Sequence, residues 1–375
     1  MRLVATCARG TEGALRRELA ALRFRRPKGA RGAVEFEGTV EDGMRACLWS
    51  RTAMRVLLPL SRFPAPDAGA LYDGARGVDW TEWLTERTTL AVEASGSTPT
   101  LTHTGFSALK VKDAVVDALR EKLGARPDVD ARNPDVRIVL HLAQGEAELS
   151  LDLGGGPLYR RGWRAATTEA PLKETLAAAV LLLGGVARDL PFLDPMCGSG
   201  TLAIEQALSA RGVAPGLGRA FGFQRWPRYR GALQSTWDRL REEARASALP
   251  RAPAPIRARD ASAEAVEATR RNAAAAGVGA DVAVEAGDAR ESEPDAASGT
   301  LCSNPPYGER LGSRPLQLAG FYRGLGAALR RFHGWRAVLL SGNPLLEREL
   351  GLRPESTHRL WNGPLEVRLL RYAIP

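Results

Sequence analysis

The amino-acid sequence predicts an α/β protein in which a doubly wound C-terminal domain follows a smaller α+β region. Residues 2–54 alternate strand and helix patterns over a short distance, which is typical of a small α+β unit. Residues 193–208 combine an apolar strand, a glycine-rich turn and a helix, the first unit of a doubly wound sheet. Further strand patterns follow, and the one at 366–372 is expected to close this mostly parallel sheet as a final antiparallel strand.

Composition and charge define the broad class of protein. A length of 375 residues suggests roughly two or three domains, and 44% hydrophobic residues is ordinary for a folded chain. Lysine and arginine number 52 against 43 acidic residues, which gives a net charge of +9 and a pI near 9.8. This balance favours a polyanionic partner such as nucleic acid, although a high-GC coding composition rich in arginine and alanine would produce the same charge.

The four cysteines, Cys7, Cys47, Cys197 and Cys302, are widely spaced and form no C-x-x-C pair. No zinc ribbon or iron–sulfur site is therefore expected, and dispersed thiols fit the reducing cytosol. The first residues contain no long apolar segment of the kind found in signal peptides. The longest apolar run, at 176–183, is far shorter than the roughly 20 residues that a membrane span needs. We expect a cytoplasmic protein without a metal site.

In the N-terminal region, strands are predicted at 2–6 and 34–38, and helices at 11–19 and 41–54, with Thr11 as the first N-cap. Basic residues cluster in the same region: Arg16, Arg17, Arg23, Arg25, Arg26, Lys28 and Arg31. Such a cluster is either a nucleic-acid surface or an ordinary solvated face, and the sequence leaves both interpretations open.

A second unit is predicted from residue 67. A strand is expected at 89–94 and a helix at 106–119, followed by a hairpin of two strands at 136–142 and 146–153. The helix has a strong 3.6-residue periodicity, and its predicted apolar side consists of Leu109, Val115, Val116 and Leu119.

The segments ALKVKDAVVDALREK and PDVRIVLHLAQGEAELSLDL, with VDWTEWL before them, resemble a THUMP domain, an RNA-binding module of RNA-modifying enzymes. The opening segment ATCARGTEGALRREL matches the same family. The resemblance implies a ferredoxin-like region at 1–66, a THUMP domain at 67–155, and RNA as the partner. It also makes Lys110 and Lys112 candidate phosphate contacts, which would add affinity without base specificity.

A linker is predicted at 156–190, after a glycine-rich break. It contains Arg160, Arg161 and Arg164 together with two aromatic residues. Arginines beside aromatic rings can neutralise phosphates and stack on bases, so these three are candidate RNA contacts, and a packed linker is the alternative. A helix is expected to begin at Pro171, because proline is favourable in the first turn.

The segment LDPMCGSGT is the candidate cofactor site. Its candidate residues are Asp194, Pro195, Cys197, Gly198, Gly200 and Thr201. The glycines let a ligand approach the backbone closely, and Asp194 ends the predicted strand. A carboxylate at this position would repel a pyrophosphate and attract a cation, which disfavours NAD. It favours S-adenosylmethionine, which carries cationic sulfonium and ammonium groups.

The spacing of the next acidic residues supports the same cofactor. Asp260 ends the second predicted strand of the domain, far beyond the ~20 residues of the dinucleotide fingerprint, and an insertion at 209–250 fills the gap. Asp288 follows the third strand. We expect Asp260 to hold the ribose hydroxyls and Asp288 to accept a hydrogen bond from the adenine amino group.

The stretch SNPPYG contains the candidate catalytic residues. The Asn304 carboxamide oxygen and the Pro305 carbonyl can accept the two hydrogens of an exocyclic amino group. Pro305 and Pro306 have a restricted φ and no N–H, so the turn is stiff and rich in acceptors. Tyr307 offers a ring on which a base can stack, worth about 1–3 kcal/mol. Binding both protons would aim the nitrogen lone pair at a methyl donor, and the alternative is a turn without catalytic function.

Cysteine chemistry is the alternative mechanism near this stretch. Cys302 lies two residues before Asn304, and a cytosine-C5 methyltransferase uses a cysteine nucleophile, which usually follows proline. Leu301 precedes Cys302 here, so we predict that Cys302 is a strand residue and that Cys197 is also structural.

Together, LDPMCGSGT, SNPPYGERLG and NGPLEVRLLRY resemble the N-terminal methyltransferase half of bacterial large-subunit rRNA guanine-N2 methyltransferases. The resemblance implies a Rossmann-like class I methyltransferase domain at 191–375. The segment EAPLKETLAAAVLLLGG resembles the part that closes over the cofactor, which adds Pro171 and Leu172 to the candidate cofactor residues. Asn304 is a candidate cofactor residue as well as a catalytic one. Two departures are that some relatives continue into a second methyltransferase domain, and that Ser262 stands where many carry an acid.

These observations predict an RNA methyltransferase that transfers a methyl group from S-adenosylmethionine to guanine N2, with 23S rRNA as the expected substrate. A tRNA guanine-N2 methyltransferase would share the domain plan. DNA adenine-N6 and protein glutamine-N5 methyltransferases also use N-P-P-Y, although the RNA-binding module argues against both, and a non-catalytic RNA-binding protein is the remaining alternative. RNA is the expected partner, without membrane or metal, and the chain is expected to be a monomer.

Overall fold

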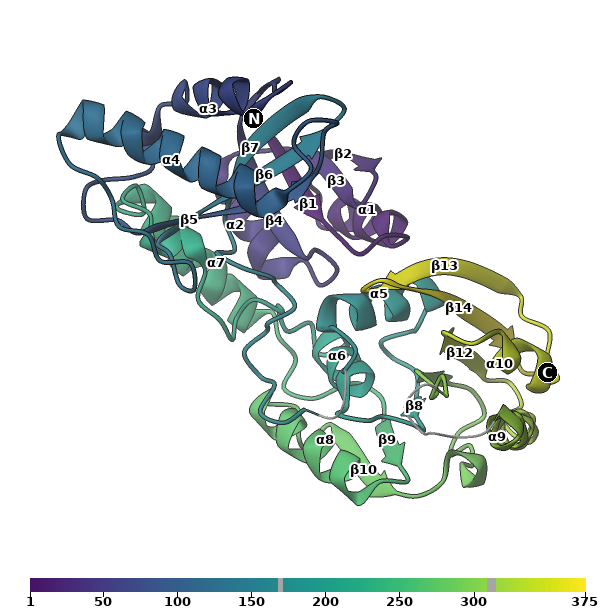
Figure 1. The fold of residues 1–375 in the computed structure, drawn as a ribbon. Helices are drawn as coiled ribbons and strands as arrows, with labels where there is room; N and C mark the ends of the chain where they lie inside the picture. Colours follow the sequence, from purple (N-terminus) through teal and green to yellow (C-terminus); the bar gives the residue numbers. More distant parts are fainter. Residues whose placement is uncertain (168–170, 309–314) are drawn as a thin grey trace. The chain divides into compact units, whose positions relative to one another are not determined.

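The computed structural model describes residues 1–167, 171–308 and 315–375, and the chain forms two units (Figure 1). The first unit contains Met1–Thr6, Leu19–Leu158 and Arg219–Glu243, and the second contains Cys7–Glu18, Tyr159–Gly218 and Ala244–Pro375. Each unit is built around its own seven-stranded sheet. Within the described ranges, no helix is both long enough and apolar enough to cross a membrane.

The sheet of the first unit has the strand order β2-β3-β1-β4-β7-β6-β5. Its strands are β1 (Arg2–Thr6), β2 (Arg25–Ala30), β3 (Ala33–Glu37), β4 (Arg55–Pro64), β5 (Leu90–Gly96), β6 (Val136–Ala143) and β7 (Glu146–Asp152). Neighbouring strands are antiparallel, except that β5 and β6 run parallel. The helices of this unit are α2 (Val40–Trp49), α3 (Ala68–Arg76) and α4 (Thr104–Leu123). Two more helices, α1 (Glu12–Ala21) and α7 (Ala232–Ala246), have residues assigned to each of the two units.

The predicted N-terminal strands, helices and hairpin are present, with additions and two corrections. β2, β4 and α3 were not predicted; β2 has the polar sequence RRPKGA, which lacks a hydrophobic alternation. The helix predicted at 41–54 ends at Trp49, because Ser50 is extended with φ −72° and ψ 122°. Thr11 precedes α1, but its hydroxyl donates to the Ala8 carbonyl at 2.6 Å instead of accepting a bond from the helix.

The prediction that Leu109 lies on the apolar side of its helix is wrong, since Leu109 is 60% exposed. The buried face of α4 includes Val111, Val115 and Leu119. Leu109 lies two residues before Val111, about 200° around the helix axis, and therefore on the opposite face.

The segment Arg219–Glu243, predicted as an insertion in the C-terminal region, packs in the first unit. Trp226 meets Trp83 edge-on, with ring centroids 5.4 Å apart. The backbones at Gly222 and Gly155 approach each other closely: a Cβ on Gly222 would lie 2.6 Å from the Gly155 Cα. Two glycines therefore allow the backbone of the insertion to approach the end of the THUMP hairpin.

The sheet of the second unit has the order β10-β9-β8-β11-β12-β14-β13. Its strands are β8 (Phe192–Asp194), β9 (Ile256–Asp260), β10 (Val282–Ala286), β11 (Thr300–Ser303), β12 (Arg336–Ser341), β13 (Ser356–Asn362) and β14 (Leu365–Ala373). Strands β8 to β12 pair in parallel, whereas β14 is antiparallel to both β12 and β13. The predicted mostly parallel sheet with an antiparallel end is confirmed.

Helices cover both faces of this sheet, and Figure 1 shows α5 and α6 on the opposite side from α9 and α10. The helices are α5 (Glu174–Gly184), α6 (Thr201–Ala210), α8 (Ala263–Ala275), α9 (Pro315–Leu329) and α10 (Pro344–Glu349). Successive residues of β11 face opposite sides of the sheet. Cys302 packs in the hydrophobic cluster that contains α5 and α6, and Leu301 packs in the cluster that contains α9 and α10. Burial on both faces explains why the central strands β11 and β12 are rich in apolar residues.

Helix α5 begins at Glu174 and not at Pro171, so the predicted first-turn role of Pro171 is wrong. Lys173 is the N-cap residue, in an extended conformation with φ −68° and ψ 139°. Leu172 also lies before the helix, where its carbonyl accepts a hydrogen bond from Arg164 Nη2 at 3.2 Å. The first two residues of the predicted closing segment, at 169–170, lie outside the described residues.

Candidate active site

The carboxyl ends of three adjacent parallel strands meet at one edge of the second sheet. Asp194 ends β8, Asp260 ends β9 and Ser303 ends β11, immediately before Asn304. The strand order reverses between β8 and β11, and doubly wound sheets bind ligands outside the carboxyl ends at such a reversal. The structure therefore brings the predicted glycine turn and the predicted catalytic stretch to the same edge.

The glycine turn after β8 is a backbone cradle. Gly198 and Gly200 have φ +54° and +83°, in the left-handed region that favours glycine. A Cβ on Gly200 would lie 2.7 Å from the Cγ2 of Thr269, so a larger residue does not fit. The Thr269 hydroxyl donates to the Gly198 carbonyl at 2.9 Å, and the Gly198 N–H donates to Asp260 Oδ2 at 2.9 Å. The second strand and its helix thus hold the turn open for a ligand.

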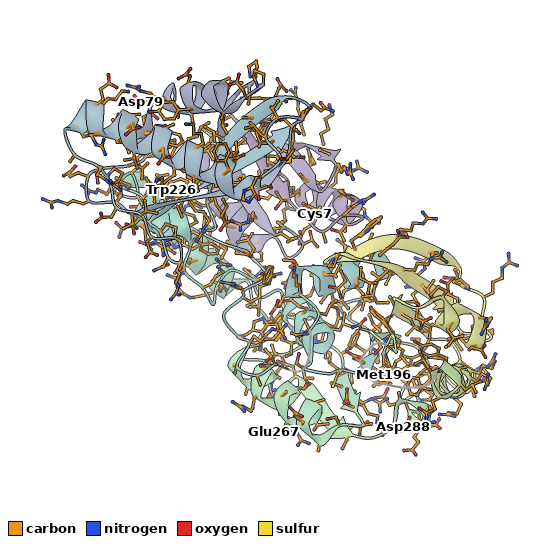
Figure 2. The ribbon with its side chains drawn as sticks, in the orientation of Figure 1. Cys7, Asp79, Met196, Trp226, Glu267 and Asp288 are labelled. Atoms are coloured by element: carbon orange, nitrogen blue, oxygen red, sulfur yellow. The ribbon has the colours of Figure 1, made fainter. Side chains whose placement is uncertain are left out.

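Asp194 is the buried carboxylate of this edge, with 1% of its surface exposed. Its Oδ1 accepts hydrogen bonds from the Ser303 hydroxyl at 2.6 Å and from the Met196 N–H at 3.3 Å. Burial raises the pKa of Asp194 to about 7, although the Ser303 hydrogen bond opposes the shift. A buried carboxyl group with a raised pKa is stabilised in its ionised form by a nearby cation. Met196, two residues after Asp194, is labelled in Figure 2.

Asp260 and Asp288 follow neighbouring strands but have different surroundings. Asp260 is half-buried and its Oδ1 accepts from the Ser262 N–H at 3.0 Å. Asp288, labelled in Figure 2, binds the Arg290 guanidinium through both oxygens, with Nε at 2.9 and 3.1 Å. The Arg290 hydrogen bonds hold the pKa of Asp288 below its ordinary value. The Asp288 carboxylate is therefore held as an anion by Arg290.

The Asn304–Tyr307 corner is already organised by its own side chains. The Tyr307 hydroxyl donates to Asn304 Oδ1 at 2.5 Å. This bond fixes which end of the carboxamide carries the oxygen, and a carboxamide oxygen has a second lone pair for another donor. One face of the Tyr307 ring lies on Gly342, where a Cβ would approach the ring to 2.5 Å.

Two neighbouring elements hold the backbone of the corner. The Tyr322 hydroxyl of α9 donates to the Pro306 carbonyl at 2.6 Å, and Asn343 Nδ2 donates to the Tyr307 carbonyl at 2.8 Å. Burial raises the pKa of Tyr322 to about 12, so its hydroxyl stays a donor. No donor to the Pro305 carbonyl is found in the described parts of the chain. Among the described residues, that carbonyl is therefore an acceptor without a donor.

Neither nearby cysteine has the character of a nucleophile. Cys302 lies in β11 with no exposed surface, and burial raises the pKa of its thiol well above the ordinary value. The Cys197 thiol is also buried, lies 3.4 Å from the Thr269 hydroxyl, and has a raised pKa for the same reason. Because the thiolate is the reactive form, both side chains are structural at neutral pH.

The three linker arginines differ in exposure. Arg160 is exposed, whereas Arg161 is 4% exposed and its Nε lies 3.4 Å from Glu205 Oε1. Arg164 binds Glu174, with Nε to Oε1 at 2.8 Å, and also contacts the glycine turn. Burial removes Arg161 from the candidate phosphate contacts, and the internal bonds of Arg164 assign it to the interior of the second unit. For Arg161 and Arg164, the structure therefore favours the alternative interpretation, in which these arginines pack inside the protein as part of the linker.

The predicted THUMP lysines lie on α4 in the first unit. Lys110 is half-buried, with its Nζ 5.3 Å from the centre of the Tyr72 ring. Lys112 Nζ lies 2.5 Å from Asp113 Oδ1, and its side chain is 25% exposed. Both ammonium groups can reach a polyanion, although Asp113 partly neutralises Lys112.

Several residues of the site were not identified from the sequence. Ser303 was inside the quoted stretch but received no role, and Tyr322 and Asn343 lie outside every motif. Asn272 of α8 bridges the linker to the turn by donating to the carbonyls of Ala166 and Ser199, both at 2.9 Å. Only the proximity of Ser303 to Asn304 was a signal in the sequence. Among the described residues, no group of three histidine, cysteine or acidic side chains could hold a metal ion.

Three family descriptions match the chain. Residues 161–370 match "RMKL-like, methyltransferase domain", residues 65–152 match "THUMP domain", and residues 2–57 match "RlmL ferredoxin-like domain". A curated relative from Syntrophotalea carbinolica, named "Ribosomal RNA large subunit methyltransferase K/L", is 43% identical over 100% of this chain and 54% of its own length. The chain spans about half the length of the curated relatives it matches.

Solved structures agree with the family matches. SMU.472, described as a putative methyltransferase complexed with SAH, has a TM-score of 0.91 and 30% identity, over 100% of this chain and 98% of that one. A predicted N6-adenine-specific DNA methylase from Listeria monocytogenes has a TM-score of 0.87 and 30% identity, over 100% and 96%. The sheet, its glycine turn and these matches together show that this chain belongs to the RMKL-like methyltransferase family, with a ferredoxin-like region and a THUMP domain before the methyltransferase domain.

Proposed function

We propose that the chain is an S-adenosylmethionine-dependent RNA methyltransferase that modifies the exocyclic N2 of a guanine in 23S rRNA. The observation that carries the proposal is the 2.6 Å hydrogen bond from Ser303 to Asp194. It joins the ends of β8 and β11, and supports a site in which Asn304, the proposed amine-binding residue, lies near the glycine turn. The names of the curated relatives support rRNA as the substrate.

The residues of the site fit this cofactor. Asp194 is a buried carboxyl group next to the turn, and its environment suits a cationic ligand. Gly200 lets the turn pack against Thr269, with which any Cβ would clash. Asp260, half-buried at the end of β9, would bind the ribose hydroxyls, and Pro171 and Leu172 precede α5 as candidate closing residues. When bound, S-adenosylmethionine supplies an electrophilic methyl group on a cationic sulfur.

The corner provides catalysis by orientation. Asn304 Oδ1 keeps one lone pair for a substrate N–H while the Tyr307 hydroxyl occupies the other. The Pro305 carbonyl accepts the second N–H, and the bonds from Tyr322 and Asn343 keep this backbone rigid. With both amino hydrogens held, the nitrogen lone pair leaves conjugation with the base and points away from the corner. Fixed orientation of this kind lowers the barrier without a covalent intermediate.

The base must leave its stack to reach this corner. One face of the Tyr307 ring is covered by Gly342, so the base would stack on the opposite face. Lys110, Lys112 and the exposed Arg160 remain candidate phosphate contacts from the predicted set. Phosphate contacts position the RNA, and the corner then selects an amino group.

Replacing Asn304 with alanine tests the proposal. Asn304→Ala should abolish methyl transfer to rRNA, while binding of S-adenosylhomocysteine, measured by calorimetry, should survive because the glycine turn, Asp194 and Asp260 are left intact. Turnover near the wild-type rate would show that the orientation mechanism is wrong. Labelled-methyl transfer to isolated 23S rRNA, bulk tRNA and duplex DNA separates the substrates; transfer to DNA adenine would match the description of the Listeria monocytogenes structure instead.

The location and assembly of the protein are part of the same proposal. The four cysteines are free and buried, which fits a reducing compartment such as the cytoplasm. A monomer suffices for the chemistry, since Asp194, Ser303 and Asn304 all come from one chain. Light scattering of the purified protein would measure its mass in solution.

A further inference from the structure

Arg164 contacts the glycine turn through its guanidinium group. Nη1 donates to the Ser199 hydroxyl at 3.0 Å, and Nη2 donates to the Thr201 hydroxyl at 3.1 Å. Nε donates to Glu174 Oε1 at 2.8 Å, and Nη2 also donates to the Leu172 carbonyl at 3.2 Å. Arg164 therefore joins the turn, the approach to α5 and the first residue of α5 in one network.

Asn272 reinforces the position of Arg164 from the neighbouring helix. Its Oδ1 accepts from the N–H groups of Ala165 and Ala166, both at 2.9 Å, and its Nδ2 donates to the carbonyls of Ala166 and Ser199. Asn272 has no exposed surface, so these bonds form in a region without competing water. The residues after Arg164 are consequently held against the same turn, and the guanidinium group has little freedom to leave it.

The charges around the turn leave one requirement of the cofactor unmet. Asp194 and Asp260 are acids, suited to the sulfonium, the ammonium or the ribose. The methionine group of S-adenosylmethionine also carries a carboxylate, which needs a cation or an N–H donor when it leaves water. In the described ranges, Arg164 is the lysine or arginine whose side chain hydrogen-bonds to the turn.

The donor inventory of Arg164 allows a further bond. A guanidinium group has five N–H donors. Nε donates to Glu174, and Nη2 lies near three acceptors: Glu174 Oε1 at 2.8 Å, the Leu172 carbonyl and the Thr201 hydroxyl. Nη1 contacts Ser199 alone among the described residues, which leaves one N–H on Nη1. The side chain of Arg164 is 18% exposed, against 5% for Glu174.

We infer that Arg164 is a cofactor-site residue that shapes the glycine turn and supplies the positive charge for the carboxylate of the methionine group. The inference rests on the proposed function, because it needs S-adenosylmethionine as the ligand. It also replaces the phosphate-binding role predicted for Arg164 from its basic and aromatic neighbours.

Two ligands that differ at the methionine group provide the test. S-adenosylhomocysteine has the carboxylate and the ammonium, whereas 5′-methylthioadenosine keeps the adenosine and the thioether and lacks both. Calorimetry should show that Arg164→Gln lowers the affinity for S-adenosylhomocysteine roughly 10- to 100-fold, the effect of a lost charged hydrogen bond. The affinity for 5′-methylthioadenosine should change less than about threefold on the same scale. Loss of an arginine near the ammonium alone would raise the affinity, so a fall reports the carboxylate.

Arg164→Lys and Arg160→Gln are the matched variants. Lysine keeps the charge without the planar fork, and should recover part of the affinity for S-adenosylhomocysteine. If Arg164→Gln does not fold, the same two-ligand comparison between Arg164→Lys and the wild type decides the question. Arg160→Gln removes an exposed arginine from the same linker and should leave both affinities unchanged.

The outcomes separate this inference from the proposed function. Equal losses for both ligands would overturn it, because Arg164 would then act only on the shape of the turn. Unchanged binding of S-adenosylhomocysteine to Arg164→Gln would overturn it as well. If the wild-type protein binds neither ligand, the proposed function itself fails.

Discussion

Replacing Asp194 with asparagine should stabilise the protein at neutral pH and weaken its binding of the cofactor. Asp194 is buried beside Ser303, and no basic side chain in the described ranges pairs with it. Burial raises its pKa from 3.8 to about 7. The wild-type chain therefore keeps an ionisable group where ionisation is unfavourable, and asparagine removes that cost while retaining an oxygen for the Ser303 hydroxyl.

The size and sign of the effect follow from the shifted pKa. A shift of about three units corresponds to on the order of 4 kcal/mol, at 1.36 kcal/mol per unit. Because the pKa is higher in the folded state, the folded state loses stability as pH rises from about 4, and the loss is complete above about pH 7. The amide of asparagine adds a buried NH₂ group that costs about 1–3 kcal/mol. The net gain above pH 7 should be roughly 1–3 kcal/mol.

Urea unfolding without cofactor, near pH 4 and near pH 8, measures this difference. Asp194→Asn should be more stable than the wild type near pH 8, and the advantage should disappear or reverse near pH 4, where the aspartate is protonated. A difference that does not change with pH would refute the argument. Asp281→Asn is the matched control: Asp281 is buried but bonded to Arg211 at 3.1 Å, so losing its charge should destabilise the chain near pH 8. Calorimetry should show weaker binding of S-adenosylhomocysteine to Asp194→Asn, and unchanged binding would remove Asp194 from the site.

The hydroxyl of Tyr307 and the lysines of α4 give two further predictions. Tyr307→Phe removes the donor to Asn304 Oδ1 and keeps the ring, so kcat should fall roughly fivefold to tenfold with little change in the KM for RNA; a raised KM at constant kcat would show that the hydroxyl acts only in RNA binding. Lys110→Gln combined with Lys112→Gln should weaken RNA binding and lower the slope of log affinity against log salt by about 1.4–1.8. An unchanged slope would show that neither lysine contacts phosphate, and binding of S-adenosylhomocysteine is the control that should not change.

Local patterns in the sequence were sufficient to predict most elements of both sheets. Two of the wrong predictions concern burial. Leu109 was grouped with the apolar residues of α4, yet it lies on the opposite face from Val111 and is 60% exposed. Arg161 was predicted to be a candidate phosphate contact, but it is buried and its Nε donates a hydrogen bond to Glu205. Whether a side chain is buried depends on what the rest of the chain places beside it, and periodicity describes only one element at a time.

The sequence by itself determined the local chemistry of the candidate site: the acids that end strands β8 and β9, the glycine turn, and the stiff corner at Asn304. These features depend on residues close together in the chain, so short-range rules describe them. The tertiary structure alone decided which side chains complete the site. Ser303 binds Asp194 across 109 positions of the chain, and Arg164 reaches Ser199 across 35. Such pairs depend on strand order and helix packing, which bring distant residues together without leaving a pattern in the sequence around either one.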